Sequence, residues 1–328
     1  VVIPNGGIKM VVADGAGSGA AVTDVLDMTG GTGNIGLGSG SLGTALTTGT
    51  DNVAIGEAAL DAVTSGSRNT AIGDNALGAN TTADDNTAIG ANALLLNTTG
   101  TNNSAVGRNA LDANTTGDSN VAFGNSALGG NTTAEGNTAL GQGSLSANTT
   151  GAHNVAVGFQ ALDANTTAAN NVAVGKSALG ANTTGTSNTA VGKDAGLAVT
   201  TGQNVTILGY TAGDALTTAD NVTAIGSLAL STATTVSGAT VVGYKAGNAA
   251  TSGASNLTAI GYRAGQAVST GTANTLVGSD AGVATTTGIN NVAVGAYSLT
   301  ANTTGEDNIS IGTGTMIANT TGSYNTAV

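Results

Sequence analysis

Residues 69–85 read NTAIGDNALGANTTADD, and residues 86–102 read NTAIGANALLLNTTGTN, so one seventeen-residue pattern occurs twice in succession. The same pattern continues through most of the 328-residue chain. A repeat of fixed period indicates stacked coils, each of which contacts only its neighbours. The sequence therefore predicts a solenoid, built for length and surface, rather than a globular domain around one pocket.

One glycine in each repeat marks the period. Successive anchor glycines are seventeen residues apart from Gly56 to Gly243, one residue is inserted before Gly261, and the period then resumes. The anchor glycines are Gly38 in a looser first copy, then Gly56, Gly73, Gly90, Gly107, Gly124, Gly141, Gly158, Gly175, Gly192, Gly209, Gly226, Gly243, Gly261, Gly278, Gly295 and Gly312. The period assigns residues 34–328 to the solenoid, and we expect further repeats after Val328. Residues 1–33 lack the period and are predicted to be a cap, an attachment module or a junction, with strands at 1–3 and 8–12.

Short extended segments precede the anchor glycines. Glycine, asparagine and paired threonine are poor helix formers, so each repeat is predicted to contain a short strand rather than a helix. Alternate strand residues share a face, which puts the residue before the glycine opposite the Asn and Ala side chains. That residue is apolar in each copy: Ile55, Ile72, Ile89, Val106, Phe123, Leu140, Val157, Val174, Val191, Leu208, Ile225, Val242, Ile260, Val277, Val294 and Ile311. Parallel coils about 4.8 Å apart turn this column into a continuous apolar ladder and the chain into a rod of about 80 Å.

A second apolar column lies four residues after the anchor glycine and divides the coils into two classes. In the first class it holds leucine: Leu60, Leu77, Leu94, Leu111, Leu128, Leu145, Leu162 and Leu179, with Leu230 and Leu299 further on. In the second class glycine replaces it, at Gly196, Gly213, Gly247, Gly265 and Gly282. Three residues later the usual Asn becomes Val199, Leu216, Ala250 or Val268, with Thr285 as the exception. This exchange predicts that both positions fill one interior volume.

The N-T-T segments are predicted to be turns, because Asn and Thr side chains bond to nearby backbone and Asn and Gly tolerate positive φ. Equivalent Asn residues are expected to stack and form amide ladders along the axis. Each segment is also an acceptor sequence for N-glycosylation. The acceptor residues are Asn80, Asn97, Asn114, Asn131, Asn148, Asn165, Asn182, Asn302 and Asn319.

Composition argues against several classes of function. The net charge is −12 with seven basic residues, so neither nucleic acid nor an anionic membrane surface is an expected partner. No apolar run is long enough to insert into a membrane. The chain lacks cysteine, and its single histidine, His153, lies in a predicted turn without nucleophile or metal-ligand spacing around it. We therefore expect no catalytic residues, no metal and no cofactor, and the acidic residues read as solvated turn charges.

Charged and aromatic residues gather one or two places after the anchor glycine, where the repeat varies most. They are Glu57, Asp74, Arg108, Phe159, Lys176, Lys193, Tyr210, Tyr244, Lys245, Tyr262, Arg263 and Tyr297. A solvated ridge explains this edge, and a multivalent contact strip is the alternative, since Tyr and Arg are favoured at interfaces. Candidate binding residues are Tyr210, Tyr244, Lys245, Tyr262 and Arg263.

The N-[TSV]-A-[VI]-G and A-L-x-x-N-T-T-G strings resemble two families. One is the head repeat of trimeric autotransporter adhesins such as the YadA family, matched at residues 53–56 and 104–107. The other is the repeat region of bacteriophage tail fibres and related surface fibres, matched at residues 69–73 and 86–100. The resemblance implies a left-handed parallel β-roll in a parallel homotrimer. The period of seventeen residues differs from the shorter unit that is usual in the adhesin head.

These observations lead to a functional expectation. The chain is expected to be a non-catalytic, extracellular fibre shaft of a virion tail or cell-surface appendage, whose partner is itself and which presents a receptor-binding region. One alternative is an adhesin head that contacts host matrix, receptor or glycan many times weakly. Another is a self-assembling filament subunit or an ice-binding solenoid, suggested by the paired threonines.

Overall fold

The computed structural model describes residues 11–13, 22–24, 33–251 and 253–328. These residues form an all-β, parallel β-solenoid of about 17 turns and contain no helix. Consequently, no helix in the described part of the chain is long and apolar enough to cross a membrane. The chain divides into two compact units, Val1–His153 and Asn154–Val328.

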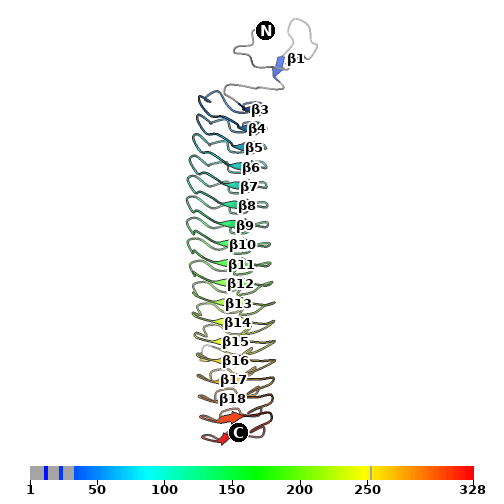
Figure 1. Cartoon of the computed structure of the whole chain (residues 1–328), viewed down its shortest axis with the longest axis vertical. Helices are drawn as coiled ribbons and strands as arrows, with labels where there is room; N and C mark the ends of the chain where they lie inside the picture. Colours follow the sequence, from blue (N-terminus) through cyan, green and yellow to red (C-terminus); the bar gives the residue numbers. More distant parts are fainter. Residues whose placement is uncertain (1–10, 14–21, 25–32, 252) are drawn as a thin grey trace. The chain divides into compact units, whose positions relative to one another are not determined.

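The first unit begins with an antiparallel pair, β1 (Val11–Ala13) and β2 (Val22–Asp24). The strand expected at residues 8–12 overlaps β1, whereas the one expected at 1–3 lies outside the described residues. The stacked strands of this unit are β3 (Ile35–Leu37), β4 (Val53–Ile55), β5 (Thr70–Ile72), β6 (Thr87–Ile89), β7 (Ser104–Val106), β8 (Val121–Phe123) and β9 (Thr138–Leu140). Each strand from β3 to β8 pairs in parallel with the next strand of this unit, with Ala54 opposite Ala71, seventeen residues on, and Gly36 opposite Ala54, eighteen residues on (Figure 1).

The second unit repeats this arrangement. Its strands are β10 (Val155–Val157), β11 (Val172–Val174), β12 (Thr189–Val191), β13 (Thr206–Leu208), β14 (Thr223–Ile225), β15 (Thr240–Val242), β16 (Thr258–Ile260), β17 (Thr275–Val277), β18 (Val292–Val294), β19 (Ile309–Ile311) and β20 (Thr326–Ala327). The inserted residue leaves the pairing intact, because Val241 lies opposite Ala259, eighteen residues on, and Ala259 lies opposite Leu276. The insertion is therefore absorbed in the loop between β15 and β16.

The anchor glycine is required by close packing of successive coils. Gly73 has φ = 136°, and a Cβ atom placed on it would lie 2.6 Å from the carbonyl carbon and oxygen of Gly90 in the next coil. The backbones approach each other there too closely for any side chain. This contact recurs in most coils and explains why the period is carried by glycine.

The interior of each coil is thin and filled by small side chains. The central residue of the strand and the residue three places after the anchor glycine are buried alanines in most coils, such as Ala71 and Ala76. The leucine column fills the remaining space, and Leu60, Leu77 and Leu94 are fully buried. These leucines adopt φ between 51° and 53°. A left-handed conformation costs a residue with a side chain about 1–2 kcal/mol, and burying a leucine offsets it by about 2 kcal/mol.

The glycine class uses the same backbone and fills its interior from other positions. A Cβ atom on Gly196, at φ = 60°, would lie 3.0 Å from Ile207, 3.1 Å from Leu179 and 3.4 Å from Val199. Val199 and Ile207 thus occupy the volume that a leucine fills elsewhere. The prediction that the two positions border one core is confirmed.

Thr285, the exception to the exchange, is explained by a third position. The strand centre, alanine in most coils, holds Leu276 in β17, and its side chain lies 2.7 Å from a Cβ placed on Gly282. This leucine fills the space that Thr285 leaves, and Ile207 and Val241 hold the equivalent place in β13 and β15. The residue three places after Gly282 gives no sign of this contribution, because Leu276 comes from the strand instead.

The apolar ladder that precedes the anchor glycines lies on the outer face of the sheet. Ala54, Ala71 and Ala88 at the strand centres are buried, whereas Ile55 and Ile72 are half-buried and Ile89 is exposed. Alternation along the strand turns Asn and Ala inward and therefore turns the aliphatic residue outward. The ladder is continuous within each unit, but the core is made by Ala and Leu.

Candidate interaction surfaces

The outer strand face combines regular geometry with apolar chemistry. Its third strand position is apolar in each coil, and many of these side chains remain between 36% and 53% exposed: Ile89, Phe123, Leu140, Val191, Leu208, Ile260, Val294 and Ile311. Contiguous apolar surface of this kind is uncommon on monomeric soluble proteins and marks interaction sites. Polar residues occur elsewhere on the surface of the repeat but not in this column, which makes the column a candidate interaction surface.

The edge after the anchor glycines carries a second surface, here called the aromatic ridge. Within the second unit it consists of Phe159, Lys176, Lys193, Tyr210, Tyr244, Lys245, Tyr262, Arg263 and Tyr297. Tyr210, Tyr244 and Tyr262 are 54%, 41% and 50% exposed. All four basic residues of residues 154–328 belong to this ridge, although that stretch also holds seven acidic residues.

Aromatic rings and cations contact each other along the ridge. The rings of Tyr244 and Tyr262 stack with centroids 5.6 Å apart and an interplanar angle of 16°. The Lys245 Nζ lies 5.5 Å from the Tyr244 centroid, and the Arg263 guanidinium lies 5.1 Å from that of Tyr262. The structure therefore brings together four of the five candidate binding residues, and exposed contacts of this type contribute about 0.5–1 kcal/mol each.

The fifth candidate, Tyr210, has its own cation. The Lys193 Nζ lies 5.2 Å from the Tyr210 centroid and also forms an ion pair with Asp194. Hydrogen bonding to that carboxylate raises the pKa of Lys193. Lys176 lies 6.0 Å from the ring of Phe159. Neither Lys176 nor Lys193 is among the candidate binding residues, and their spacing at the same place in successive repeats is the signal that identifies them.

The asparagines of the N-T-T segments point into the coils. The Nδ2 group of Asn97 donates to Oδ1 of Asn80 at 3.2 Å and to the carbonyl of Gly100 at 2.9 Å. Asn114 donates in turn to Oδ1 of Asn97 at 2.8 Å. The side chains of Asn80, Asn97, Asn114, Asn131, Asn148, Asn165, Asn182 and Asn302 are fully buried, and Asn319 is partly exposed. In the folded coils the buried amides are inaccessible to glycan transfer, so modification there requires an unfolded chain.

A second asparagine ladder precedes the strands. The backbone N–H and the Nδ2 group of Asn69 both donate to Oδ1 of Asn52, at 2.9 and 3.1 Å, and Nδ2 also donates to the carbonyl of Ala83 at 2.8 Å. One buried amide thereby links its own coil to the previous one. Val205, Val222, Ala239 and Leu257 replace this asparagine in four successive coils.

The two threonines of each N-T-T segment lie in different environments, the first bonded to the next coil and the second facing solvent. The first hydroxyl bonds to the next coil, since Thr98 Oγ1 donates to the carbonyl of Thr115 at 3.0 Å and Thr115 donates to that of Thr132 at 2.9 Å. The second residue of each pair, such as Thr99 or Thr116, is exposed. One exposed threonine per coil forms a single column at the turn rather than a flat two-dimensional array.

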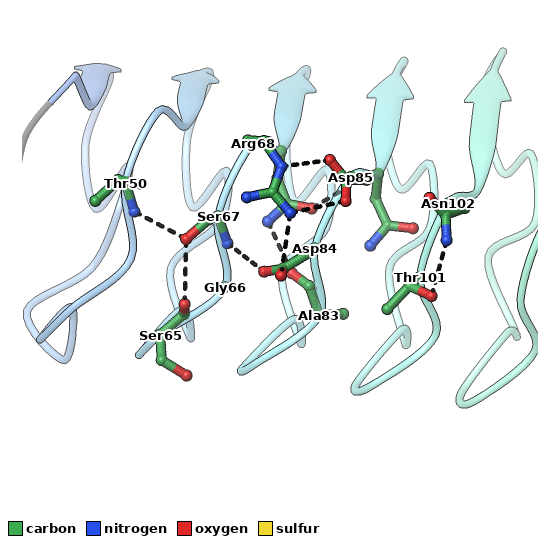
Figure 2. A network of polar contacts seen from close by, with 12 residues as sticks. Thr50, Ser65, Gly66, Ser67, Arg68, Ala83, Asp84, Asp85, Thr101 and Asn102 are labelled. Atoms are coloured by element: carbon green, nitrogen blue, oxygen red, sulfur yellow. Dashed lines mark hydrogen bonds and ion pairs between the residues drawn. The ribbon is translucent and has the colours of Figure 1, made fainter.

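Polar side chains link turns of the first unit, as Figure 2 shows. Arg68 Nε donates to Asp85 Oδ1 at 2.6 Å, and Arg68 also reaches Asp84 at 3.3 Å. The Asp84 carboxylate accepts the backbone N–H of Ser67 at 2.7 Å, and Ser67 Oγ accepts that of Thr50 at 3.1 Å. The Arg68 guanidinium lowers the pKa of Asp85. The network connects successive coils, and its charged side chains lie in solvent-exposed turns.

A third set of polar groups lies five residues after every third anchor glycine from Gly56 to Gly209. Asp61, Asp112, Asp163 and Asp214 occupy this column, and burial raises the pKa of the last three. In the coil that follows, a Cβ on Gly129 would lie 3.2 Å from the Asp112 carboxylate. The column therefore follows a three-coil period superimposed on the seventeen-residue repeat.

Within the described residues, no three His, Asp or Glu side chains converge to hold a metal ion. His153 lies exposed in its turn, with Nε2 3.9 Å from Glu135 Oε1. Comparison of the chain with family models, curated proteins and solved structures gives no significant match. Function is therefore inferred from the outer strand face and the aromatic ridge.

Proposed function

We propose that the protein is a non-catalytic fibre shaft that associates with copies of itself through the outer strand face. The exposed aliphatic column carries this proposal, because each coil repeats an apolar residue at a place that the fold of one chain leaves in contact with water. Burying such a column between copies recovers about 25 cal/mol for each Å² of apolar surface. Repetition over many coils multiplies the gain without requiring any single strong contact.

A parallel homotrimer is the assembly we propose. Three copies in register around a threefold axis bring identical apolar columns together, so the outer strand face of each copy is covered by the other two. The left-handed β-roll of the resembled fibre families belongs to the same proposal. In this arrangement the shaft spaces a receptor-binding region from an anchor, on a virion tail or a cell surface outside the cell. Its partners are its own copies, with neither nucleic acid nor inserted membrane.

Sedimentation equilibrium of the full chain tests the assembly. We expect a mass about three times the 30.8 kDa of one chain. Replacing Ile89, Phe123 and Leu140 together with lysine is expected to reduce the mass toward one chain while circular dichroism retains its β spectrum, since the side chains face outward. The control replaces the exposed turn residues Thr82, Thr99 and Thr116 with lysine and is expected to leave the mass unchanged. A wild-type chain that sediments as a monomer would refute the proposal.

The multivalent adhesin is the second candidate function, and the stacked Tyr244 and Tyr262 rings with their cations favour it. Each contact on such an edge is weak, and repetition along one chain raises the overall avidity. This function is compatible with the shaft, because the aromatic ridge and the outer strand face occupy different positions of the repeat.

A further inference from the structure

We propose that the aromatic ridge of the second unit binds an acidic polysaccharide, a linear sugar polymer that bears carboxylates. The charge distribution is the first reason. Residues 154–328 hold seven acidic and four basic residues, yet every basic residue lies on this one edge. Because the few positive charges of this stretch gather on one edge, they attract an anion to that edge alone. Binding at the ridge does not depend on self-association of the strand faces.

The available hydrogen-bond donors are the second reason. Lys176 and Lys245 form no ion pair within the described residues, whereas Lys193 and Arg263 are paired with Asp194 and Asp280. No hydrogen bond involves the phenol hydroxyls of Tyr244 and Tyr262 in that part of the chain, although both rings are exposed. The ridge therefore offers ammonium and phenol groups to oxygen acceptors.

The orientation of the rings decides how a ligand is held. The faces of Tyr244 and Tyr262 meet each other, and the cations of Lys245 and Arg263 lie over the rings. Stacking thereby fixes the tyrosines at low entropic cost and leaves their hydroxyls as the accessible groups. A ligand rich in hydroxyls and carboxylates along one line satisfies such donors, and carboxylates bind more strongly because the contacts are charge-assisted.

The arrangement of the rings favours a polysaccharide over single-stranded nucleic acid. Nucleic acid carries a phosphate at every nucleotide, and its binding sites use many cations together with ring faces on which bases stack. The ridge leaves two cations unpaired and uses its ring faces internally. A polysaccharide, which offers hydroxyl groups and carboxylates and has no bases that need a ring face, matches this pattern.

Isothermal titration of the full chain at low ionic strength tests the inference with polygalacturonate and with its methyl ester, in which a methyl group on each carboxylate removes the charge. We expect polygalacturonate to bind and the neutral ester to bind much more weakly. The variant Lys176→Gln with Lys245→Gln is expected to weaken binding about tenfold. Gln142 and Gln160 occupy the equivalent places of other coils, so glutamine is compatible with the fold there.

Two further variants separate the ridge from general charge. Tyr244→Ser with Tyr262→Ser is expected to weaken binding several-fold, and serine suits the fold there because Ser227 and Ser279 occupy the equivalent places of other coils. Arg108→Gln removes a cation from the equivalent place of a coil in the first unit and is expected to leave binding unchanged. Absence of polygalacturonate binding, equal binding of the ester, or an equal loss with Arg108→Gln would overturn the inference. Tighter binding of oligothymidylate, lost in the same lysine variant, would assign the ridge to nucleic acid instead.

Discussion

The coils that carry Asn80 to Asn148 and the coils that carry Val199 to Val268 share one backbone and differ in what fills it. In the first, buried amides bond from coil to coil, as Asn114 does to Asn97. In the second, aliphatic side chains such as Val199 and Val268 occupy the same place and are fully buried. The coil is therefore specified by its glycines and turns, while its interior accepts either of two chemistries.

The leucine column shows how the exchange is possible. The backbone four residues after the anchor glycine is left-handed in both classes, with φ = 54° at Leu111 and 60° at Gly196. Leucine accepts the strain and fills the core, whereas glycine avoids the strain and leaves a space for neighbours. At the junction between classes the ladder ends on Asn182, whose buried Oδ1 has no hydrogen-bond partner. The transition between the two interiors therefore has a local cost.

The largest expected effect comes from emptying an asparagine-lined coil. Leu111→Ala is expected to reduce the free energy of unfolding by about 3 kcal/mol, because it removes a fully buried side chain from a thin core. Denaturant unfolding followed by circular dichroism measures the change. Leu96→Ala, at a residue that is 49% exposed, is the control and is expected to cost less than about 1 kcal/mol. Equal losses for the two variants would show that the leucine column does not form the core.

The next largest effect is the difference in stability between two asparagine substitutions, one at the end of a ladder and one where no ladder exists. Val199→Asn supplies a donor near the unpartnered Oδ1 of Asn182, whereas Val268→Asn lies between coils that hold Ala250 and Thr285. Both lose apolar burial, but only the second leaves its buried amide without an amide neighbour. We expect Val268→Asn to cost about 1–2 kcal/mol more than Val199→Asn in the same unfolding measurement. The reverse order would contradict a ladder that stabilises through its amides.

The smallest effect concerns the half-buried carboxylates of both kinds of coil. Burial raises the pKa of Asp112 and Asp214, so the folded state holds their protons more strongly than the unfolded state does. This contribution is present below the ordinary pKa of aspartate and is lost as the pH rises through the raised pKa of the folded state. Asp112→Asn and Asp214→Asn are therefore expected to raise the thermal midpoint near neutral pH and to leave it unchanged near pH 3. Asp61→Asn, at an exposed position of the same column, should have less effect, and a lowered midpoint for Asp112→Asn at neutral pH would exclude desolvation as the cause.

The sequence predicts the coil well because the period, the glycines and the turn residues act locally. It also predicts the exchange between Leu and Val199-type residues, since volume lost at one place must be regained nearby. It does not decide which face of a three-residue strand is inside, because Ala and Ile are both apolar and only the small residue fits the thin interior. The amide ladders expected of equivalent asparagines are confirmed at Asn97 and Asn69, whereas the further bond from Asn69 to the carbonyl of Ala83, fourteen positions away, does not follow from the period.

The sequence likewise predicts some features of the candidate surfaces and not others. Tyr244, Lys245, Tyr262 and Arg263 recur at fixed places after the anchor glycine, so the period alone brings them together. The buried state of the N-T-T asparagines was not evident, because a turn sequence and an internal ladder use the same residues. Which side chain points inward depends on the path of the whole coil rather than on the turn itself.

A fluorescent label gives the sharpest test of whether copies of this chain meet through the outer strand face. The chain has no cysteine, so Phe123→Cys provides a single attachment site on that face and Thr116→Cys provides one on an exposed turn of the same unit. Each protein is labelled with pyrene, whose excimer emission appears only when two labels touch. We predict excimer emission from position 123 and none from position 116. Excimer emission from position 116 with only monomer emission from position 123 would contradict association through the strand face.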